Sequence, residues 1–419
     1  MAKTTGGFGL DNALSFESPQ SLFSSELQQY APDYRPGWHQ LLIIGNGFDL
    51  ECGLPSKFKD FYEPRHEAML SYEEEYSNPE VPWGRLLKDD GLTIWDVILA
   101  DEAGEYWCNI EAALRDWIAP EYDCAGGNRK AGSLLKAIKE ANCDSAGDDQ
   151  PGSLVSDVLL ARAFRYVADN IDASETMCWT ADTLLDYLFL ELHDLERQFA
   201  SYLNDAVARA EGYANTANEL LFTLLLDERA SEKDYRIDES ILSFNYTRPA
   251  NHLDTDTHEI NLVNVHGRLG SEIVFGIDGK DLPKDSGELR FTKTYRLMAL
   301  DVPNVEKLIW PHALGLDGGT SLIKFYGHSL SEADYSYFQA IFDSVGLYDS
   351  STRLIFYYKP REDASASRDS MMKKVFHLLD IYGNTMDNPD HGKNLIHKLL
   401  LEGRLSVKPL PERTVRRKQ

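Results

Sequence analysis

Polar side chains that could bind or act on a ligand follow several short apolar runs in the second half of the sequence. Asn245 and His266 each follow one such run, and Gly327-His328-Ser329 follows a third. An imidazole titrates near neutral pH and could act as a general base, whereas a carboxamide can orient a water molecule through its donor and acceptor. Each residue also has a structural alternative, since His can cap a strand end and Asn can form a turn.

The first strong strand signal is the run Leu-Leu-Ile-Ile at residues 41–44, which lacks helical spacing and predicts a strand buried on both faces. Gly45 and Gly47 follow, and a helix is expected next. Such a unit can hold a phosphate with its backbone N–H groups, but the dinucleotide fingerprint needs a third Gly where this chain has Leu50. An ordinary tight turn is therefore the alternative. Asp49 either caps the helix or faces a pocket.

Composition and missing motifs narrow the function classes. The sequence has no G-x-S-x-G elbow, no H-x-x-x-H pair, no P-loop and no C-x-x-C pair. A formal net charge of −26 over 419 residues disfavours a broad nucleic-acid or anionic-lipid surface. Five scattered cysteines suit a reducing compartment, and neither a signal peptide nor a membrane-spanning run is recognisable. We expect a cytoplasmic protein without a metal or a membrane partner.

Helical periodicity dominates the middle of the chain, where apolar residues recur at about 3.5-residue spacing between 185 and 202. Short strands return after residue 240, including one expected at 272–275, and helices alternate with them. This pattern predicts an α/β fold with a mostly parallel, Rossmann-like sheet and a large α-helical insertion. The predicted parts are an N-terminal extension at 1–38, the first strand, glycine turn and helix at 39–65, the helical insertion at 66–235, the remainder of the α/β domain at 236–405 and a basic tail at 406–419.

A parallel sheet brings the carboxyl ends of its strands to one edge, where open α/β sheets bind their ligands. The three polar clusters and the Gly45 turn are therefore expected to meet in one crevice.

Five motifs in order resemble the AbiH family of bacterial abortive-infection proteins over residues 41–358. They are GNGFDLECGLPSKFKDF from Gly45, WCNIEAAL from Trp107, SFNYT from Ser243, VHG from Val265, and YGHSL from Tyr326 followed by Asp334. The pattern is also distantly similar to the sirtuin-type NAD-binding domain. The spacing of Gly45, Gly47, Gly53 and Pro55 matches the sirtuin phosphate turn. Thr247 replaces a sirtuin Asp, and the four-cysteine zinc ribbon of sirtuins is missing, so protein deacylation is not expected.

The resemblance implies an anti-phage effector that binds NAD and hydrolyses its nicotinamide–ribose bond. Asn245 and His266 would be catalytic, and Phe48 and Tyr246 would wall the nicotinamide pocket. The implied NAD-binding residues are Gly45, Asn46, Gly47, Phe48, Asp49, Pro55, Tyr246, Gly267, Gly327, His328, Ser329 and Asp334.

The main alternative to an NADase is a nucleotide-sensing, non-catalytic module of a phage-defence complex. A homo-oligomer or a defence partner protein is expected in either case. An effector that acts on nucleic acid or on another nucleotide is a third alternative. The acidic charge disfavours nucleic acid unless the basic tail or a partner supplies the binding surface.

Overall fold

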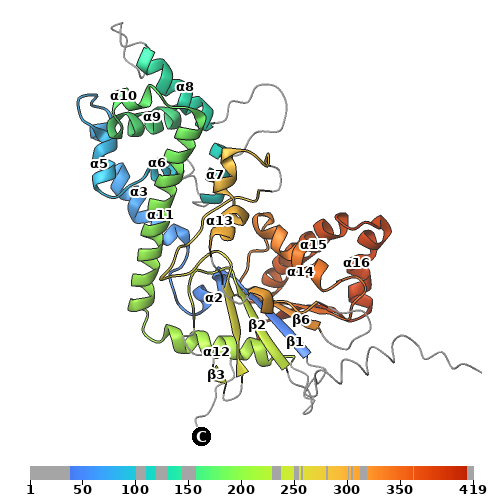
Figure 1. The fold of residues 1–419 in the computed structure, drawn as a ribbon. Helices are drawn as coiled ribbons and strands as arrows, with labels where there is room; N and C mark the ends of the chain where they lie inside the picture. The colour runs from blue at the N-terminus through green and yellow to red at the C-terminus, as the bar shows by residue number, and fades with distance from the viewer. Residues whose placement is uncertain are drawn as a thin grey trace, which may run out of the picture.

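A six-stranded sheet forms the centre of the protein, with strand order β5-β2-β1-β6-β7-β8 and every neighbouring pair parallel (Figure 1). Its strands are β1 (Trp38–Ile44), β2 (Ile237–Ser243), β5 (Asn261–Asn264), β6 (Gly319–Tyr326), β7 (Arg353–Tyr358) and β8 (Leu405–Pro409). The computed structural model describes residues 38–100, 110–118, 130–143, 157–228, 237–249, 254–255, 258–279, 282–300, 302, 305–311, 319–361 and 363–412. The predicted parallel α/β fold is confirmed.

Strand β1 lies in the middle because its aliphatic run at 41–44 is buried on both faces, as predicted. Leu41 and Ile43 belong to one apolar core, and Leu42 and Ile44 belong to another on the opposite face. Helices cover both faces: α12 (Tyr213–Leu226) packs on one, and α14 (Tyr335–Ser344), α15 (Ala364–Asn384) and α16 (Pro389–Leu401) pack on the other (Figure 1). The sheet is therefore the middle of three layers.

A fully buried lysine joins α12 to the sheet. The ammonium of Lys324, in the central strand β6, donates to the carbonyl oxygens of Leu224 at 2.7 Å, Leu225 at 3.0 Å and Asp227 at 2.5 Å. Carbonyl groups at a helix C-terminus lack intrahelical partners and carry the negative end of the helix dipole, so a buried cation there is compensated.

We expect Lys324→Met to destabilise the protein by about 3 kcal/mol, because it leaves several buried carbonyl groups without their charged donor. The matched control is Lys408→Met, since that half-exposed lysine of β8 pairs with Glu228 at the surface and should contribute less than about 1 kcal/mol. Urea unfolding of both variants measures the difference. Equal losses would show that the Lys324 bonds do not hold α12.

The helical insertion has an apolar core of its own at one end of the molecule (Figure 1). Its helices are α3 (Phe58–Leu70), α4 (Glu73–Tyr76), α5 (Trp83–Asp89), α6 (Ile94–Ala100), α7 (Ile110–Ile118), α8 (Lys130–Cys143), α9 (Val158–Asn170), α10 (Ala173–Thr176) and α11 (Ala181–Arg209). The predicted helix with 3.5-residue spacing is α11, and it runs from this group toward the sheet (Figure 1). Helix α3 packs in the apolar core of the insertion, and α12 packs against the sheet. The boundaries of the insertion at residues 66 and 235 stay a prediction.

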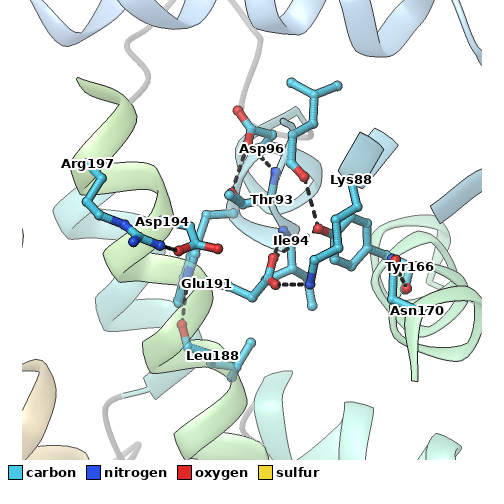
Figure 2. A network of polar contacts seen from close by, with 12 residues as sticks. Lys88, Thr93, Ile94, Asp96, Tyr166, Asn170, Leu188, Glu191, Asp194 and Arg197 are labelled. Atoms are coloured by element: carbon cyan, nitrogen blue, oxygen red, sulfur yellow. Dashed lines mark hydrogen bonds and ion pairs between the residues drawn. The ribbon is translucent and has the colours of Figure 1, made fainter. Parts of the chain in front are cut away.

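Figure 2 shows how a buried carboxylate joins three segments of the insertion. Glu191 of α11 accepts hydrogen bonds from the Ile94 amide at 3.1 Å, the Tyr166 hydroxyl at 2.9 Å and the Lys88 ammonium at 2.8 Å. A buried carboxylate is tolerated only where donors surround it. Glu191 therefore fixes how α5, α6 and α9 pack on α11.

One expectation about strands is wrong. Residues 272–275 form no strand, because this segment makes only an isolated bridge between Gly267 and Ile273. The first residues of the predicted basic tail lie in strand β8, which pairs with β7 at the edge of the sheet. The predicted N-terminal extension lies outside the described residues, except for Trp38, and so does the tail from 413 onward. Among the residues described, no helix is both long and apolar enough to cross a bilayer.

Candidate functional site

The glycine turn after β1 packs directly against the loop after β6. The Gly47 amide donates to the Gly327 carbonyl at 2.8 Å, and the Gly45 amide donates to the Tyr326 carbonyl at 3.1 Å. A Cβ atom on Gly47 would lie 2.7 Å from the Cα of Gly327. These glycines therefore permit the close approach of two backbones, and both N–H groups are committed to protein carbonyls rather than available to a phosphate.

A cavity of about 300 Å³ opens beside this turn, between the carboxyl edge of the sheet and the insertion. This volume is at the small end of the range for ligand sites. The residues that line it come from α2 (Asn46–Glu51), the insertion, the segment after β2 and residue 275. They are Asn46, Asp49, Ser56, Phe58, Ile110, Glu111, Phe199, Leu203, Phe244, Asn245, Tyr246, Thr247 and Phe275. Of the predicted site residues, Asn46, Asp49, Asn245 and Tyr246 are among them.

Asp49 is buried and faces the cavity rather than capping α2, whose N-cap is Gly45. The Tyr213 hydroxyl donates to its Oδ1 at 2.7 Å, and the Thr247 hydroxyl donates to its Oδ2 at 2.6 Å. Burial raises the pKa of Asp49 to about 6, although hydrogen bonds from Thr247, Tyr213 and Asn245 oppose that rise. At neutral pH this carboxylate is therefore ionised and able to accept a proton.

We expect Asp49→Asn to remove part of the pH dependence of stability. The folded pKa of about 6 exceeds the ordinary value of 3.8, so this group stabilises the folded state fully below about pH 4 and loses that contribution as pH rises through about 6. The shift corresponds to roughly 3 kcal/mol. Urea unfolding at pH 4 and pH 7 should show wild type losing up to that amount relative to the variant. Parallel profiles for wild type and Asp49→Asn would contradict this assignment, and the exposed control Asp205→Asn should run parallel to wild type.

The segment after β2 is clamped in place by a residue that sequence reasoning missed. The Asn264 side chain, at the end of β5, donates to the carbonyls of Asn245 at 2.7 Å and Thr247 at 2.9 Å. Asn245 in turn donates from Nδ2 to the Gly45 carbonyl at 3.1 Å. Three strand ends are thereby joined at one edge, which confirms that these segments converge.

Beside the cavity lies a group of charged and imidazole side chains that we call the Asp334 cluster: Glu111, His266, Lys293, His328 and Asp334. All but Glu111, which lines the cavity, are buried. The Lys293 ammonium lies 2.8 Å from Asp334 Oδ1 and 2.6 Å from Glu111 Oε1. His266 Nε2 lies 3.4 Å from Asp334 Oδ1, which is long for a hydrogen bond, and His328 Nε2 lies 3.3 Å from Oδ2. One carboxylate therefore gathers residues from three separate segments.

Burial and neighbouring charge set the protonation states of this cluster. Burial alone would raise the pKa of Asp334, but His266, His328 and the Lys293 charge hold that pKa well below its ordinary value. Burial opposes the charge of Lys293, yet Asp334 and Glu111 raise the pKa of this ammonium. Burial, and then the Lys293 charge, lower the pKa of His266, so its imidazole is neutral at neutral pH.

His266 is not among the residues that line the cavity, whereas its neighbour Phe244 is. The Phe244 ring lines the cavity and lies 5.3 Å from the His266 ring, centroid to centroid. Gly267 has φ +83°, and a Cβ there would lie 2.1 Å from the Glu272 carbonyl oxygen, so this glycine serves a tight turn. Direct action of His266 on a ligand in this cavity is therefore not part of the geometry, and its ring contacts Phe244 instead.

Other predicted ligand residues lie away from the cavity. Phe48 is fully buried in the core beneath α12, and Pro55 is exposed, with its carbonyl accepting from Tyr202 at 3.0 Å. Ser329 is exposed, whereas His328 and Asp334 belong to the buried cluster. Gly327 meets the glycine turn from the other side.

Glu111, Lys293, Thr247 and Asn264 are the site residues that sequence reasoning left out. Glu111 carried a signal, since it is a carboxylate at the border of an apolar helix face. Lys293 carried none, because only the folded chain brings it to Glu111 and Asp334.

Comparison with protein families matches residues 41–358 to the family described as Bacteriophage abortive infection AbiH. The matched region contains the last four residues of β1, all of β2, β5, β6 and β7, the insertion and every lining residue of the cavity. Comparison with curated proteins finds no match. Because the match covers most of its length, the chain belongs to the bacteriophage abortive infection AbiH family.

Proposed function

We propose that this protein acts in abortive infection by binding NAD in the cavity and hydrolysing the nicotinamide–ribose bond. The observation that supports this best is the convergence of Asp49, Glu111 and Asn245 on one aromatic-walled cavity. The cavity lies at the carboxyl edge of a parallel sheet, where ligands of open α/β folds bind.

The chemistry would proceed through a ribose cation. The bond between C1′ and the ring nitrogen breaks with its electron pair going to the nitrogen, so nicotinamide leaves as a neutral molecule. Asp49 and Glu111, which both line the cavity, would stabilise the positive charge that develops on the ribose. Water then adds to C1′ and gives its proton to Asp49, a base with a pKa of about 6. The products are nicotinamide, ADP-ribose and a proton.

Asn245 would orient the attacking water. Its Nδ2 donates to the Gly45 carbonyl at 3.1 Å, so the carboxamide oxygen is the atom that this side chain offers to water or a ribose hydroxyl. His266 would act as a positioning residue in the same reaction, because its imidazole contacts Asp334, which shares Lys293 with Glu111.

The cavity volume limits which part of NAD lies inside. About 300 Å³ suits the nicotinamide and ribose, with the remaining nucleotide extending outward. The predicted phosphate contacts of the Gly45 and Gly47 amides are not part of this proposal, since both groups already donate to carbonyls.

The test is nicotinamide release from NAD by the purified full chain, alone and with extract of phage-infected cells. Wild type should release nicotinamide, and Asp49→Asn and Asn245→Ala should each lower the rate by about 100-fold or more. The matched controls Asp205→Asn and Asn204→Ala, both exposed on α11, should keep the wild-type rate.

Absence of release by wild type under both conditions would overturn the proposal, and so would full activity of Asp49→Asn. If calorimetry shows tight NAD binding without release, the nucleotide-sensing, non-catalytic module is the better account.

A further inference from the structure

The described residues that line the cavity include two carboxylates and neither Lys nor Arg. We infer that the cavity binds a positively charged planar heterocycle and that Glu111, delivered by the helical insertion, is its counter-ion. This inference rests on the proposed function, because the oxidised nicotinamide ring of NAD is such a group, and it names the ligand class that the site takes.

The charge of the cluster supports a site for cations. Lys293 is buried between Glu111 and Asp334, so two carboxylates share one ammonium. The Leu330 amide donates to His328 Nδ1 at 2.9 Å, which requires a lone pair on Nδ1 and leaves the ring proton on Nε2. The described cluster therefore holds two carboxylates and one ammonium, and Asp49 adds a third carboxylate at the cavity lining.

Glu111 is the member of the cluster that reaches the cavity. Its side chain is 29% exposed, whereas those of Lys293 and Asp334 are 4% and 10% exposed. The Lys293 contact at 2.6 Å restrains the carboxylate without covering it. Because Glu111 lies on α7, the insertion supplies a second carboxylate to the cavity, in addition to Asp49 of α2.

Aromatic side chains form the walls of this cavity: Phe58, Phe199, Phe244, Tyr246 and Phe275. Phe199 and Tyr246 meet edge to face at 5.9 Å, and the Tyr246 hydroxyl donates to the Val274 carbonyl at 3.2 Å, which fixes the ring. Aromatic faces attract cations and stack on planar rings, whereas they give a phosphate no compensation. The wall and the charges therefore favour the same class of ligand.

The test uses two ligands that have no ribosyl bond to cleave. Isothermal calorimetry should show that wild type binds the cation 1-methylnicotinamide at least about 10-fold more tightly than neutral nicotinamide, as expected for one charge pair in a partly buried site. Glu111→Gln should reduce that preference to less than about 3-fold, while the exposed control Glu67→Gln on α3 should retain it.

A second ligand pair, 1-methyladenosine and adenosine, tests whether the charged ring that binds is a modified nucleobase or nicotinamide. A preference for the methylated base alone would support the inference and assign the site to a modified base rather than to nicotinamide. Equal binding of charged and neutral rings by wild type would overturn it, as would an undiminished preference in Glu111→Gln. Neither result depends on NAD hydrolysis, so failure of the proposed reaction and failure of this inference are separable.

Discussion

Replacing Gly327 by alanine is expected to destabilise the protein by more than about 3 kcal/mol or to prevent folding. The residue has φ +75°, a left-handed conformation that costs an L side chain about 1–2 kcal/mol. A Cβ atom there would also lie 2.4 Å from the Phe48 amide nitrogen, which belongs to the backbone of α2 and cannot move aside. The contact joins the two loops that frame the candidate site, so the site should be lost with it.

Gly53→Ala is the matched control for this prediction. Gly53 has φ +83°, but a Cβ atom there would meet nothing within 4 Å, so only the conformational cost of about 1–2 kcal/mol applies. Urea unfolding and the yield of folded protein measure both variants. Similar losses for the two alanines would show that the close approach of the loops does not limit stability.

Removing the buried cation Arg296 is expected to cost about 3–5 kcal/mol, because it strands the carboxylate of Glu196 inside the protein. The guanidinium of Arg296, on α13 (Lys293–Ala299), lies 2.8 Å from Glu196 Oε2 and donates to the Phe275 carbonyl at 3.1 Å. Glu196 also accepts from the Phe275 amide at 2.6 Å. Burial raises the pKa of Glu196, and Arg296 opposes that rise. Without Arg296 the carboxylate is protonated more easily, so the loss of folding stability should be larger at pH 7, where the unpaired group would have to stay charged, than at pH 4.

Arg296→Met is compared with Arg197→Met, whose guanidinium is 77% exposed and pairs with Asp194 on the surface of α11. The surface variant should lose less than about 1 kcal/mol. A double variant, Arg296→Met with Glu196→Gln, should recover part of the loss, since it removes the stranded charge. If the two arginine variants are equally stable at pH 7, the buried pair does not tie α11 to residue 275.

Much of the fold could be predicted from the sequence, because buried strands and helices carry apolar residues at regular spacing. The side chains of the aliphatic run in β1 alternate between two apolar cores. The apolar residues at 3.5-residue spacing in α11 form the buried face of that helix in the insertion. Strand β8 was missed because its residues are only partly buried at the edge of the sheet, so no apolar run marks it. The segment at 272–275 resembles a strand because Ile273 and Phe275 are buried, but they pack into the insertion core instead.

The site was predictable in outline and not in detail. Strand-end motifs placed Asn245 and Asp49 at one edge, because parallel topology makes strand ends meet. The same motifs could not show that His266 is not among the residues lining the cavity or that the glycines serve backbone packing. Nor could they pair Glu111 with Lys293, since that contact depends on how the insertion folds back on the sheet.

The most direct measurement is a crystal structure of the Asp49→Asn variant grown with NAD. We expect the nicotinamide ring inside the cavity, with Glu111 beside it, Asn245 near C1′ and the phosphates outside. Nicotinamide bound elsewhere on the protein, or a cavity that remains without NAD at saturating concentration, would contradict it.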